Sequence, residues 1–427
     1  MSICDELAAH RDNHQAITAA YAESEQGRGR SRDVNRMLVA HRTRGDELYS
    51  VRAATIYAEL TEQFTVRRRL GELLALATDL YPGLLPDRLQ LSYDRQRMQQ
   101  HKLGLEFDHG LLASWWLDDA VCGAHLIDSM TAPLPKALVL LNELREFDQV
   151  DLGVVRVERN GVAGEVTLQN HAFLNAEDVT SVRALELAVD LVLLDDRIEI
   201  GVLRGAPATH PKYAGRRVFS SGLNLTHLVQ GRIPLVDFFL NRELGAMNKI
   251  LRGHPVDGPS GGPERRHEKP WIGALETFAI GGGCQILLVC DQVIGETGSY
   301  FSLPAGREGI IPGLGGMRLA RVFGDAQSRL AVTTKVTYPA DSPLGRQLVG
   351  TVVEPAEMTD AIAACVAEQT EVGAISARAN RRAMRIAAEP VDLLRRCLAN
   401  YTRDQAECLF DPALTGNLHR IWRRSVS

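Results

Sequence analysis

The sequence predicts an α/β protein flanked by a helical N-terminal region and a helical C-terminal tail. Across 1–150, apolar residues recur at helical spacing with polar residues between them. Across 151–370, strand-like apolar runs alternate with helical patterns, which is the order expected of an α/β domain. The stretch 371–427 is rich in Ala and Arg and has a helical pattern. We expect this tail to pack on the core or on a neighbouring subunit.

The N-terminal region is expected to contain a helix that runs from Leu60 through Leu80. Its apolar residues fall at helical spacing, and Tyr81-Pro82-Gly83 should end it. A further helix is expected over Ala137–Leu144. The adjacent Trp115 and Trp116 are interpreted as anchors of a core or of an interface.

The α/β region is expected to begin with a β-hairpin. In GVVRVERNGVAGEVTLQN, apolar and polar residues alternate on either side of Asn160-Gly161, which is a strong signal for a tight turn. A helix is expected over 175–194, followed by a buried strand over 198–206. The segment RRVFSSGLNL, over 216–225, is expected to be a strand that ends in a turn of small residues.

Another strand is expected over 270–280, and it leads into three consecutive glycines. The CQILLVCD that follows Gly281-Gly282-Gly283 is expected to begin a helix. Before that strand, the segment 253–270 is rich in Gly, Pro and charge, which predicts a mobile surface loop.

Composition and charge exclude some classes of function. Hydrophobic residues make up 45% of the chain and charged residues 24%, which is typical of soluble globular proteins. The net charge of −5 argues against nucleic acid as the main partner. No apolar run is long enough to span a bilayer, and MSICDELAAH lacks the basic and apolar segments of a secretory signal. We therefore expect a cytoplasmic protein with no membrane partner.

The sequence indicates no metal or dinucleotide site. The seven cysteines are scattered without a C-x-x-C pair, so we expect reduced thiols and no structural zinc. His10-x-Asp12-x-His14 resembles part of an iron-binding triad, but it lies in a polar segment and is interpreted as solvated surface. The glycines of PGLGGMRL follow a turn rather than a strand, which argues against a dinucleotide fingerprint.

Two glycine-bearing turns carry the candidate chemistry. In FSSGLNL, Gly222 follows a predicted strand and leaves the backbone N–H of Leu223 free to point into a cleft. In IGGGCQ, the glycines open a helix, so the N–H of Gly282 is among the unpaired donors at the positive end of the helix dipole. Two such donors that converge on one oxygen form an oxyanion hole, which can stabilise a thioester enolate. Either turn alone indicates only tight packing, whereas the pair is more specific.

These segments resemble the crotonase (enoyl-CoA hydratase/isomerase) superfamily over about 151–356. The matching segments are VVRVERNGVAGEVTLQN, VFSSGLNL, KPWIGALETFAIGGGCQILLVCD and FSLPAGREGIIPGLGGMRLARVFG. The resemblance implies a crotonase-like spiral of β-β-α units that assembles into trimers. It aligns Leu223 and Gly282 with the two backbone donors that hold the thioester carbonyl in that superfamily.

The departures from the family pattern argue against a hydratase. Hydratases have a catalytic glutamate after the GGGC turn and another after a Leu-Pro pair, whereas this chain has Gln285 and Ala305 there. Adding water across a double bond needs a general acid and a general base, and neither expected group is present. Glu308 is either a displaced carboxylate or a structural ion pair with a nearby arginine.

Within the superfamily, nearly the whole chain resembles the 3,5-dihydroxyphenylacetyl-CoA 1,2-dioxygenase family. The shared features include the long N-terminal region with GLEFDHGLLASWWLDD, the segments HAFLNAEDV and FFLNREL, and the Gln and Leu-Pro-Ala departures. This resemblance implies a reaction of an arylacetyl-CoA enolate with O₂ that needs no cofactor, releases 3,5-dihydroxyphenylglyoxylate and CoA, and serves dihydroxyphenylglycine and glycopeptide antibiotic biosynthesis. A homotrimer or homohexamer is implied as well. The alternatives are another crotonase reaction, such as thioester hydrolysis or decarboxylation, and a non-catalytic acyl-CoA-binding scaffold.

The same resemblance provides candidate site residues. Glu177 and Arg242 match substrate contacts, although an ordinary surface salt bridge explains the two residues equally well. Gln285 is expected to hydrogen-bond the substrate or a peroxide oxygen, or else to cap a helix. The apolar residues Ile280, Ile310, Ile311 and Leu314 are expected to enclose an O₂ pocket or to pack in the core. The candidate catalytic residues are Leu223, Gly282 and Gln285, and the candidate substrate-binding residues are His171, Glu177, His210, Pro211, Lys212, Tyr213, Ser221, Gly222, Leu223, Asn224, Leu225, Arg242, Gly282, Gly283, Cys284 and Gln285.

Overall fold

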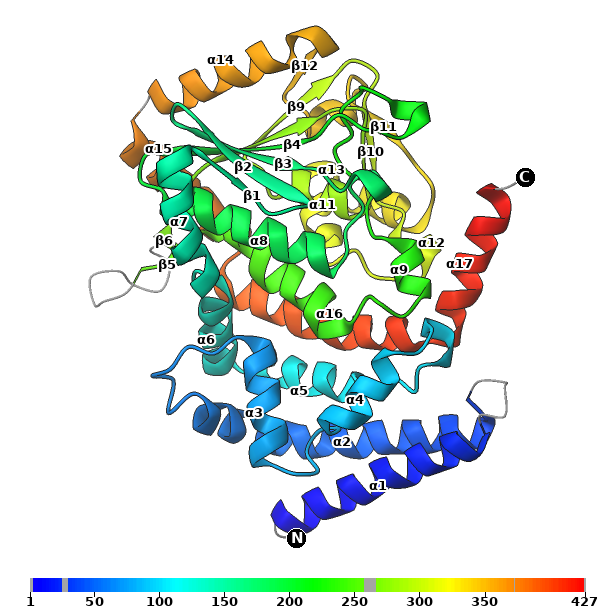
Figure 1. The fold of residues 1–427 in the computed structure, drawn as a ribbon. Coiled ribbons are helices and arrows are strands. Elements are labelled where there is room, and N and C mark those ends of the chain that lie inside the picture. Colours follow the sequence, from blue (N-terminus) through cyan, green and yellow to red (C-terminus); the bar gives the residue numbers. More distant parts are fainter. Residues whose placement is uncertain (1–2, 25–29, 257–265, 372, 426–427) are drawn as a thin grey trace.

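A helical layer packs beneath an α/β body in the computed structural model, which describes residues 3–24, 30–256, 266–371 and 373–425. Figure 1 shows the sheet and its helices above, most of the N-terminal helices below, and α16 (Val391–Phe410) between the two parts. This arrangement confirms the predicted α/β class with helical flanks. The N-terminal helices are α1 (Ile3–Ser24), α2 (Arg32–Leu60), α3 (Leu70–Leu80), α4 (Arg88–Arg95), α5 (Phe107–Asp118), α6 (Ala120–Thr131) and α7 (Pro135–Phe147).

The prediction of one helix from Leu60 through Leu80 is wrong for residues 61–69. The helix α2 ends at Leu60, and α3 begins only at Leu70. Between them, Glu62, Gln63 and Phe64 adopt positive φ angles of 50°, 56° and 65°, which no α-helix tolerates. The predicted end of α3 before Tyr81 and the helix over Ala137–Leu144 are both confirmed.

The main sheet has seven strands in the order β1-β2-β3-β4-β7-β9-β12. Its first three strands are antiparallel, and β3, β4, β7, β9 and β12 then run parallel. The predicted hairpin is confirmed, because Asn160 pairs with Ala163 across the turn. The strands are β1 (Gln149–Asp151), β2 (Val155–Asn160), β3 (Ala163–Leu168), β4 (Ile200–Gly205), β7 (Trp271–Leu275), β9 (Gln292–Glu296) and β12 (Thr351–Val353).

A second, smaller sheet brings the glycine-bearing turns together. It consists of β8 (Phe278–Ile280), β10 (Tyr300–Ser302) and β11 (Tyr338–Pro339) in the order β11-β10-β8. The single strand predicted over 270–280 is therefore wrong: Thr277, with φ 59°, redirects the chain from β7 into β8. The strand predicted over 216–225 forms only isolated bridges, including Ser220 to Ala279 beside β8.

The remaining helices cover the sheets and close the candidate site. Arg242 lies in one of two consecutive π-helical turns, a conformation that is frequent at functional sites. The predicted helical tail is confirmed, and its helix α16 packs on α5. These elements are α8 (Val179–Leu194), α9 (Leu225–Val229), the π-helical turns η4 (Leu235–Leu240) and η5 (Arg242–Met247), α10 (Asn248–Arg252), α11 (Gly282–Leu287), α12 (Ala305–Glu308), α13 (Gly315–Thr333), α14 (Met358–Glu371), α15 (Ala374–Ala388), α16 (Val391–Phe410) and α17 (Pro412–Ser425).

The segment predicted to be a loop is anchored at both of its ends. Its middle, 257–265, lies outside the described residues, while β5 (His254–Pro255) and β6 (Arg266–His267) pair antiparallel beside it. Glu268 is buried there against Arg381, at 3.0 Å.

No helix in the described ranges is both long and apolar enough to cross a membrane. The six cysteines that can be described are free.

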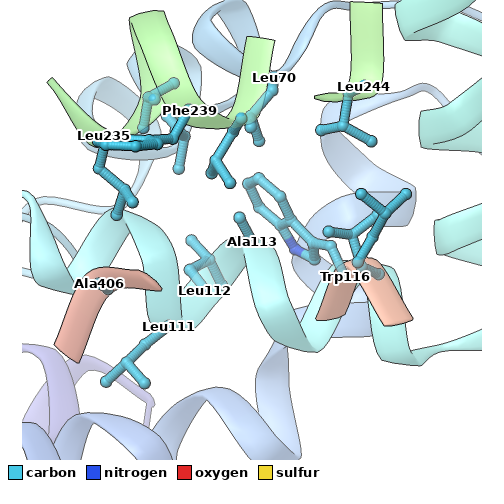
Figure 2. Packing of buried hydrophobic residues seen from close by; sticks show 14 of the residues in the cluster. Leu70, Leu111, Leu112, Ala113, Trp116, Leu235, Phe239, Leu244 and Ala406 are labelled. Carbon is cyan, nitrogen blue, oxygen red and sulfur yellow. The ribbon is translucent and has the colours of Figure 1, made fainter. Parts of the chain in front are cut away.

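Trp116 is fully buried where the helical layer meets the α/β body. Figure 2 shows its indole among Leu70, Phe239 and Leu244, which come from α3, η4 and η5. Its Nε1–H donates to the carbonyl of Ala53 at 3.0 Å. The predicted role of Trp116 as a core anchor is therefore confirmed.

Replacing Trp116 with Ala is expected to lower the free energy of unfolding by about 3–5 kcal/mol, because the cavity left behind cannot collapse. Urea unfolding followed by circular dichroism measures the change. Leu89→Ala is the control, since Leu89 is 82% exposed on α4. Equal losses in the two variants would contradict the central position of Trp116.

Candidate active site

The two glycine-bearing turns lie in contact and line one cavity. Gly222 has φ 88°, and a side chain there would come within 2.7 Å of the carbonyl oxygen of Ile280. A side chain at Gly281 would lie 3.8 Å from the Cα of Gly222. The close approach explains the glycine at 222, and the φ angle of 53° at Gly281 favours glycine there. Leu223 and Gly282 both line the cavity that these turns border.

The N–H groups of Leu223 and Gly282 donate no hydrogen bond to any group in the described ranges. The parallel bridge between Glu177 and Leu223 uses the N–H of Glu177, which donates to the carbonyl of Gly222 at 2.7 Å. Gly282 is the first residue of α11, where backbone donors have no partner within the helix.

Hydrogen bonds hold both of these peptide units in place. The carbonyl of Gly222, which shares a peptide plane with the N–H of Leu223, accepts from Glu177. The carbonyl of Gly281, in the same plane as the N–H of Gly282, accepts from the N–H of Gln285 at 3.1 Å. Because peptides are planar, fixing each carbonyl also fixes the direction of its N–H. The two donors are thus oriented before any ligand binds.

Arg242 connects the residues around the cavity. Its Nε donates to Glu177 Oε1 at 2.9 Å, and its Nη1 donates to Glu243 Oε1 at 2.7 Å and to Gln285 Oε1 at 2.9 Å. Its Nη2 donates to the carbonyl of Gly282 at 2.9 Å. Burial by itself lowers the pKa of Arg242, but the carboxylates of Glu177 and Glu243 raise it above its ordinary value. The guanidinium therefore stays charged.

These contacts change the interpretation of three candidate residues. Glu177 and Arg242 do form a salt bridge, but it is buried in the site rather than exposed on a helix surface. The side chain of Gln285 accepts from Arg242 and caps no helix. All three line the cavity together with Leu223 and Gly282.

Glu308 is a further carboxylate at the cavity. It ends α12, three residues after the buried Ala305, and both residues line the cavity. The sequence left two interpretations of Glu308 open, a displaced carboxylate or an ion pair with an arginine. Glu308 forms no ion pair with an arginine among the described contacts. Burial raises the pKa of Glu308 to about 7. Its carboxyl group can therefore exchange a proton near neutral pH.

Several candidate residues lie away from the cavity. His171, Pro211 and Lys212 are exposed on short 3₁₀ turns, and the exposed His210 precedes the second of these turns. Lys212 Nζ lies 5.1 Å from the ring centroid of Tyr213. Asn224 caps α9 by accepting from the N–H of His227. Their predicted contacts with CoA or substrate stay predictions. The candidates outside the cavity lining are His171, His210, Pro211, Lys212, Tyr213, Asn224, Leu225, Gly283 and Cys284.

Cys284 is a core residue in the structure. Its side chain is fully buried in the hydrophobic cluster beneath the main sheet. Burial raises the pKa of the thiol to about 12, so it stays protonated. Of the apolar residues expected around O₂, Ile280, Ile310 and Ile311 line the cavity, and Leu314 packs in the core instead.

The sequence did not indicate several residues that line the cavity. Phe238, Phe239 and Glu243 lie in or beside the segment FFLNREL, so the match of that segment to relatives was their one signal. Tyr401 reaches the cavity from α16, far along the chain, and no local pattern marked it. Pro312 and Gly313 complete the lining.

Comparisons with known proteins agree with the fold and with the resemblance. The family model of enoyl-CoA hydratase/isomerase matches residues 265–402. The chain is 43% identical over 372 residues to (3,5-dihydroxyphenyl)acetyl-CoA 1,2-dioxygenase from Amycolatopsis orientalis, covering 87% of this chain and 85% of that protein. It is 28% identical over 211 residues to a short-chain-enoyl-CoA hydratase from Clostridium acetobutylicum, covering 49% of this chain and 72% of that protein.

A solved structure supports the fold separately. An enoyl-CoA hydratase from Bacillus halodurans superposes with a TM-score of 0.51 at 18% identity, covering 63% of this chain and 100% of that chain. The likeness confirms the crotonase-like fold over the shared part. The rest of this chain has no counterpart in that hydratase.

Proposed function

Because this chain belongs to the enoyl-CoA hydratase/isomerase family, we propose that it is a dioxygenase that converts 3,5-dihydroxyphenylacetyl-CoA and O₂ to 3,5-dihydroxyphenylglyoxylate and free CoA. The observation that carries the proposal is the cavity itself. It pairs two oriented backbone donors with Gln285 and Ala305, where a hydratase has its two carboxylates. The 43% identity over 87% of the chain supports the choice of substrate.

In the first step, the substrate loses a benzylic proton while its thioester oxygen is held by the N–H groups of Leu223 and Gly282. The ring and the carbonyl both acidify this proton, and the two donors stabilise the charge that develops on oxygen. One such donor accelerates a reaction by roughly 10²–10³ in known cases. Because both peptide planes are already fixed, little reorganisation accompanies the charge development.

We assign the proton acceptor to Glu308. Glu177 and Glu243 line the same cavity, but Arg242 holds both of them in ion pairs. Glu308 has no such partner among the described side chains, and its pKa of about 7 suits a general base at neutral pH. Glu308 thereby takes the role of the displaced carboxylate.

In the second step, the enolate transfers an electron to O₂, and the two radicals combine into an α-peroxy thioester. The peroxide oxygen attacks the thioester carbon and expels the CoA thiolate, which gives a four-membered cyclic peroxide. Loss of the remaining benzylic proton then breaks the O–O bond and leaves one oxygen atom of O₂ in the keto group and the other in the carboxylate of the arylglyoxylate. The electron-rich enolate is the reductant, so the reaction needs no cofactor. The apolar Ile280, Ile310 and Ile311 provide a lining suited to O₂.

The proposal also includes the biosynthetic pathway, the cellular compartment and the oligomeric state. The product suits the biosynthesis of dihydroxyphenylglycine for glycopeptide antibiotics in the cytoplasm. A homotrimer or homohexamer is proposed on the same family resemblance.

The deciding experiment supplies 3,5-dihydroxyphenylacetyl-CoA to chelator-treated protein and follows O₂ uptake and CoA release together. We expect equal amounts of O₂ consumed and CoA released. Release of CoA without O₂ uptake would instead indicate a thioester hydrolase. Binding of the thioester without turnover would indicate a non-catalytic scaffold.

A further inference from the structure

The first helix buries two histidines where apolar residues are expected. Its buried positions follow the spacing 7, 10, 14, 17 and 21, which forms a single stripe along α1. Three of these residues are apolar or aromatic, but His10 and His14 are only 4% and 3% exposed. The sequence-based interpretation of His10-x-Asp12-x-His14 as solvated surface is therefore wrong for both histidines, although Asp12 is exposed.

Two other helices direct polar side chains at the same point. His41 comes from α2 and Asp108 from α5, and each is buried to at least the same degree. Asp108 Oδ2 lies 2.7 Å from His14 Nε2 and 3.0 Å from His41 Nε2. One ligand atom from each of His10, His14, His41 and Asp108 lies within 4.8 Å of the other three.

Hydrogen bonds do not fully satisfy this cluster. In the described structure, neither ring nitrogen of His14 has a hydrogen-bond partner with acceptable geometry, and the same holds for Nδ1 of His41. The rings crowd together, with 4.1 Å between the centroids of His41 and each of the other two histidines. The lack of a side chain at Gly45 makes room for this cluster, since a Cβ there would come within 3.1 Å of His10. Buried polar groups without partners are costly, which calls for a ligand that binds several nitrogens at once.

We propose that His10, His14, His41 and Asp108 bind one divalent transition-metal ion, Zn²⁺, which joins α1 to α2 and α5. Three imidazoles and a carboxylate form a ligand set that Zn²⁺ accepts in tetrahedral geometry, with bonds of about 2.0–2.2 Å. Such bonds place neighbouring ligand atoms roughly 3.3 Å apart, so the side chains need to shift by only about 1 Å. The carboxylate offsets part of the ion's charge in the buried interior.

The site is structural in this proposal. Four protein ligands leave no open position for a substrate or water, which distinguishes structural from catalytic zinc sites. None of the four residues lines the cavity between Leu223 and Gly282. The ion therefore has no part in the reaction proposed above. It stabilises the helical layer, because a site formed by three helices exists only in the folded chain.

The test uses the full-length protein and Zn²⁺ itself. Metal analysis by mass spectrometry after desalting is expected to find about one zinc per chain. Removal with a chelator should lower the Tm by on the order of 5 °C, and added Zn²⁺ should restore it. Co²⁺ loaded in place of zinc should give the intense visible absorption of a four-coordinate ion.

A matched pair of variants identifies the ligands. His14→Gln should lose the metal, the Co²⁺ absorption and the Zn²⁺-dependent rise in Tm. His109→Gln should keep all three, because His109 is equally buried beside Asp108 but is not one of the four residues. Metal bound equally by wild type and His14→Gln, or lost in both variants, would overturn the proposal. So would wild-type protein that binds no metal above background, a result that stands even if His14→Gln fails to fold.

Oxygen uptake separates this inference from the proposed dioxygenase activity. Chelated protein assayed well below its Tm is expected to keep its O₂ uptake. Uptake without any bound metal in the wild type would refute the zinc site and leave the dioxygenase intact. Bound zinc without O₂ uptake would leave the zinc site intact and refute the dioxygenase.

Discussion

Gly282→Ala is expected to lower kcat/KM for the arylacetyl thioester by about 10²–10³, the effect of losing one oxyanion donor. A Cβ at this position would lie 1.5 Å from Glu177 Oε2 and 3.2 Å from Arg242 Nη2. Glu177 cannot simply rotate away, because Arg242 binds both of its carboxylate oxygens. The start of α11 must therefore move, and the N–H of residue 282 moves with it. Initial rates of O₂ uptake over a range of thioester concentrations measure the loss.

The control for this change is Gly316→Ala. Gly316 lies in the first turn of α13, and a side chain there would meet no atom within 4 Å. It should therefore keep the wild-type rate. The Tm of both variants shows whether lost activity reflects unfolding. A folded Gly282→Ala enzyme with wild-type rates would mean that the reaction occurs outside this cavity.

Local features of the fold were predictable from the sequence. The hairpin at Asn160-Gly161 depends on a two-residue turn, and the buried strand β4 depends on the apolar run Ile200–Leu203. Both signals lie within about ten residues. Gly222 and Gly281 were predictable for the same reason, since each has a positive φ angle, 88° and 53°, which favours glycine.

Features that depend on distant segments were not predictable in this way. Apolar spacing continues past Leu60, yet three left-handed residues break the helix there. Arg242 contacts Glu177 and Gln285, which lie 65 and 43 residues away. The polar sequence around His10 predicts a solvated helix. This prediction fails because the partners of His10, which are His41 and Asp108, come from other helices. Composition cannot reveal such tertiary neighbours.

Glu308→Gln is expected to lower kcat by about 10²–10⁴, the usual contribution of a general base. It should also remove a limb of the pH profile. The pKa of Glu308 is raised by burial from 4.5 to about 7, and the base acts when it is deprotonated. Wild-type kcat/KM should therefore rise with pH and reach half its plateau near pH 7, whereas the residual activity of the variant should show no such rise. O₂ uptake between pH 5 and 9 measures both effects.

Stability gives a second measurement that does not depend on activity. Because the folded protein holds the proton of Glu308 more tightly than the unfolded chain, the carboxyl group's contribution to stability is complete below pH 4.5 and is lost as pH rises through about 7. Glu308→Gln keeps a neutral side chain at every pH. The variant should therefore gain Tm relative to wild type above pH 7 and show no gain at pH 4.

Arg307→Gln is the control for Glu308→Gln, since the exposed Arg307 precedes Glu308 and does not line the cavity. It should keep both the wild-type rate and the rise near pH 7. If Glu308→Gln gains Tm at high pH but keeps the wild-type rate and pH profile, the pKa of Glu308 is raised as inferred but Glu308 is not the base. The proton would then have to pass to another group at the cavity. Among the carboxylates that line it, the candidates would be Glu177 and Glu243, and either one would have to leave its ion pair with Arg242 to accept it.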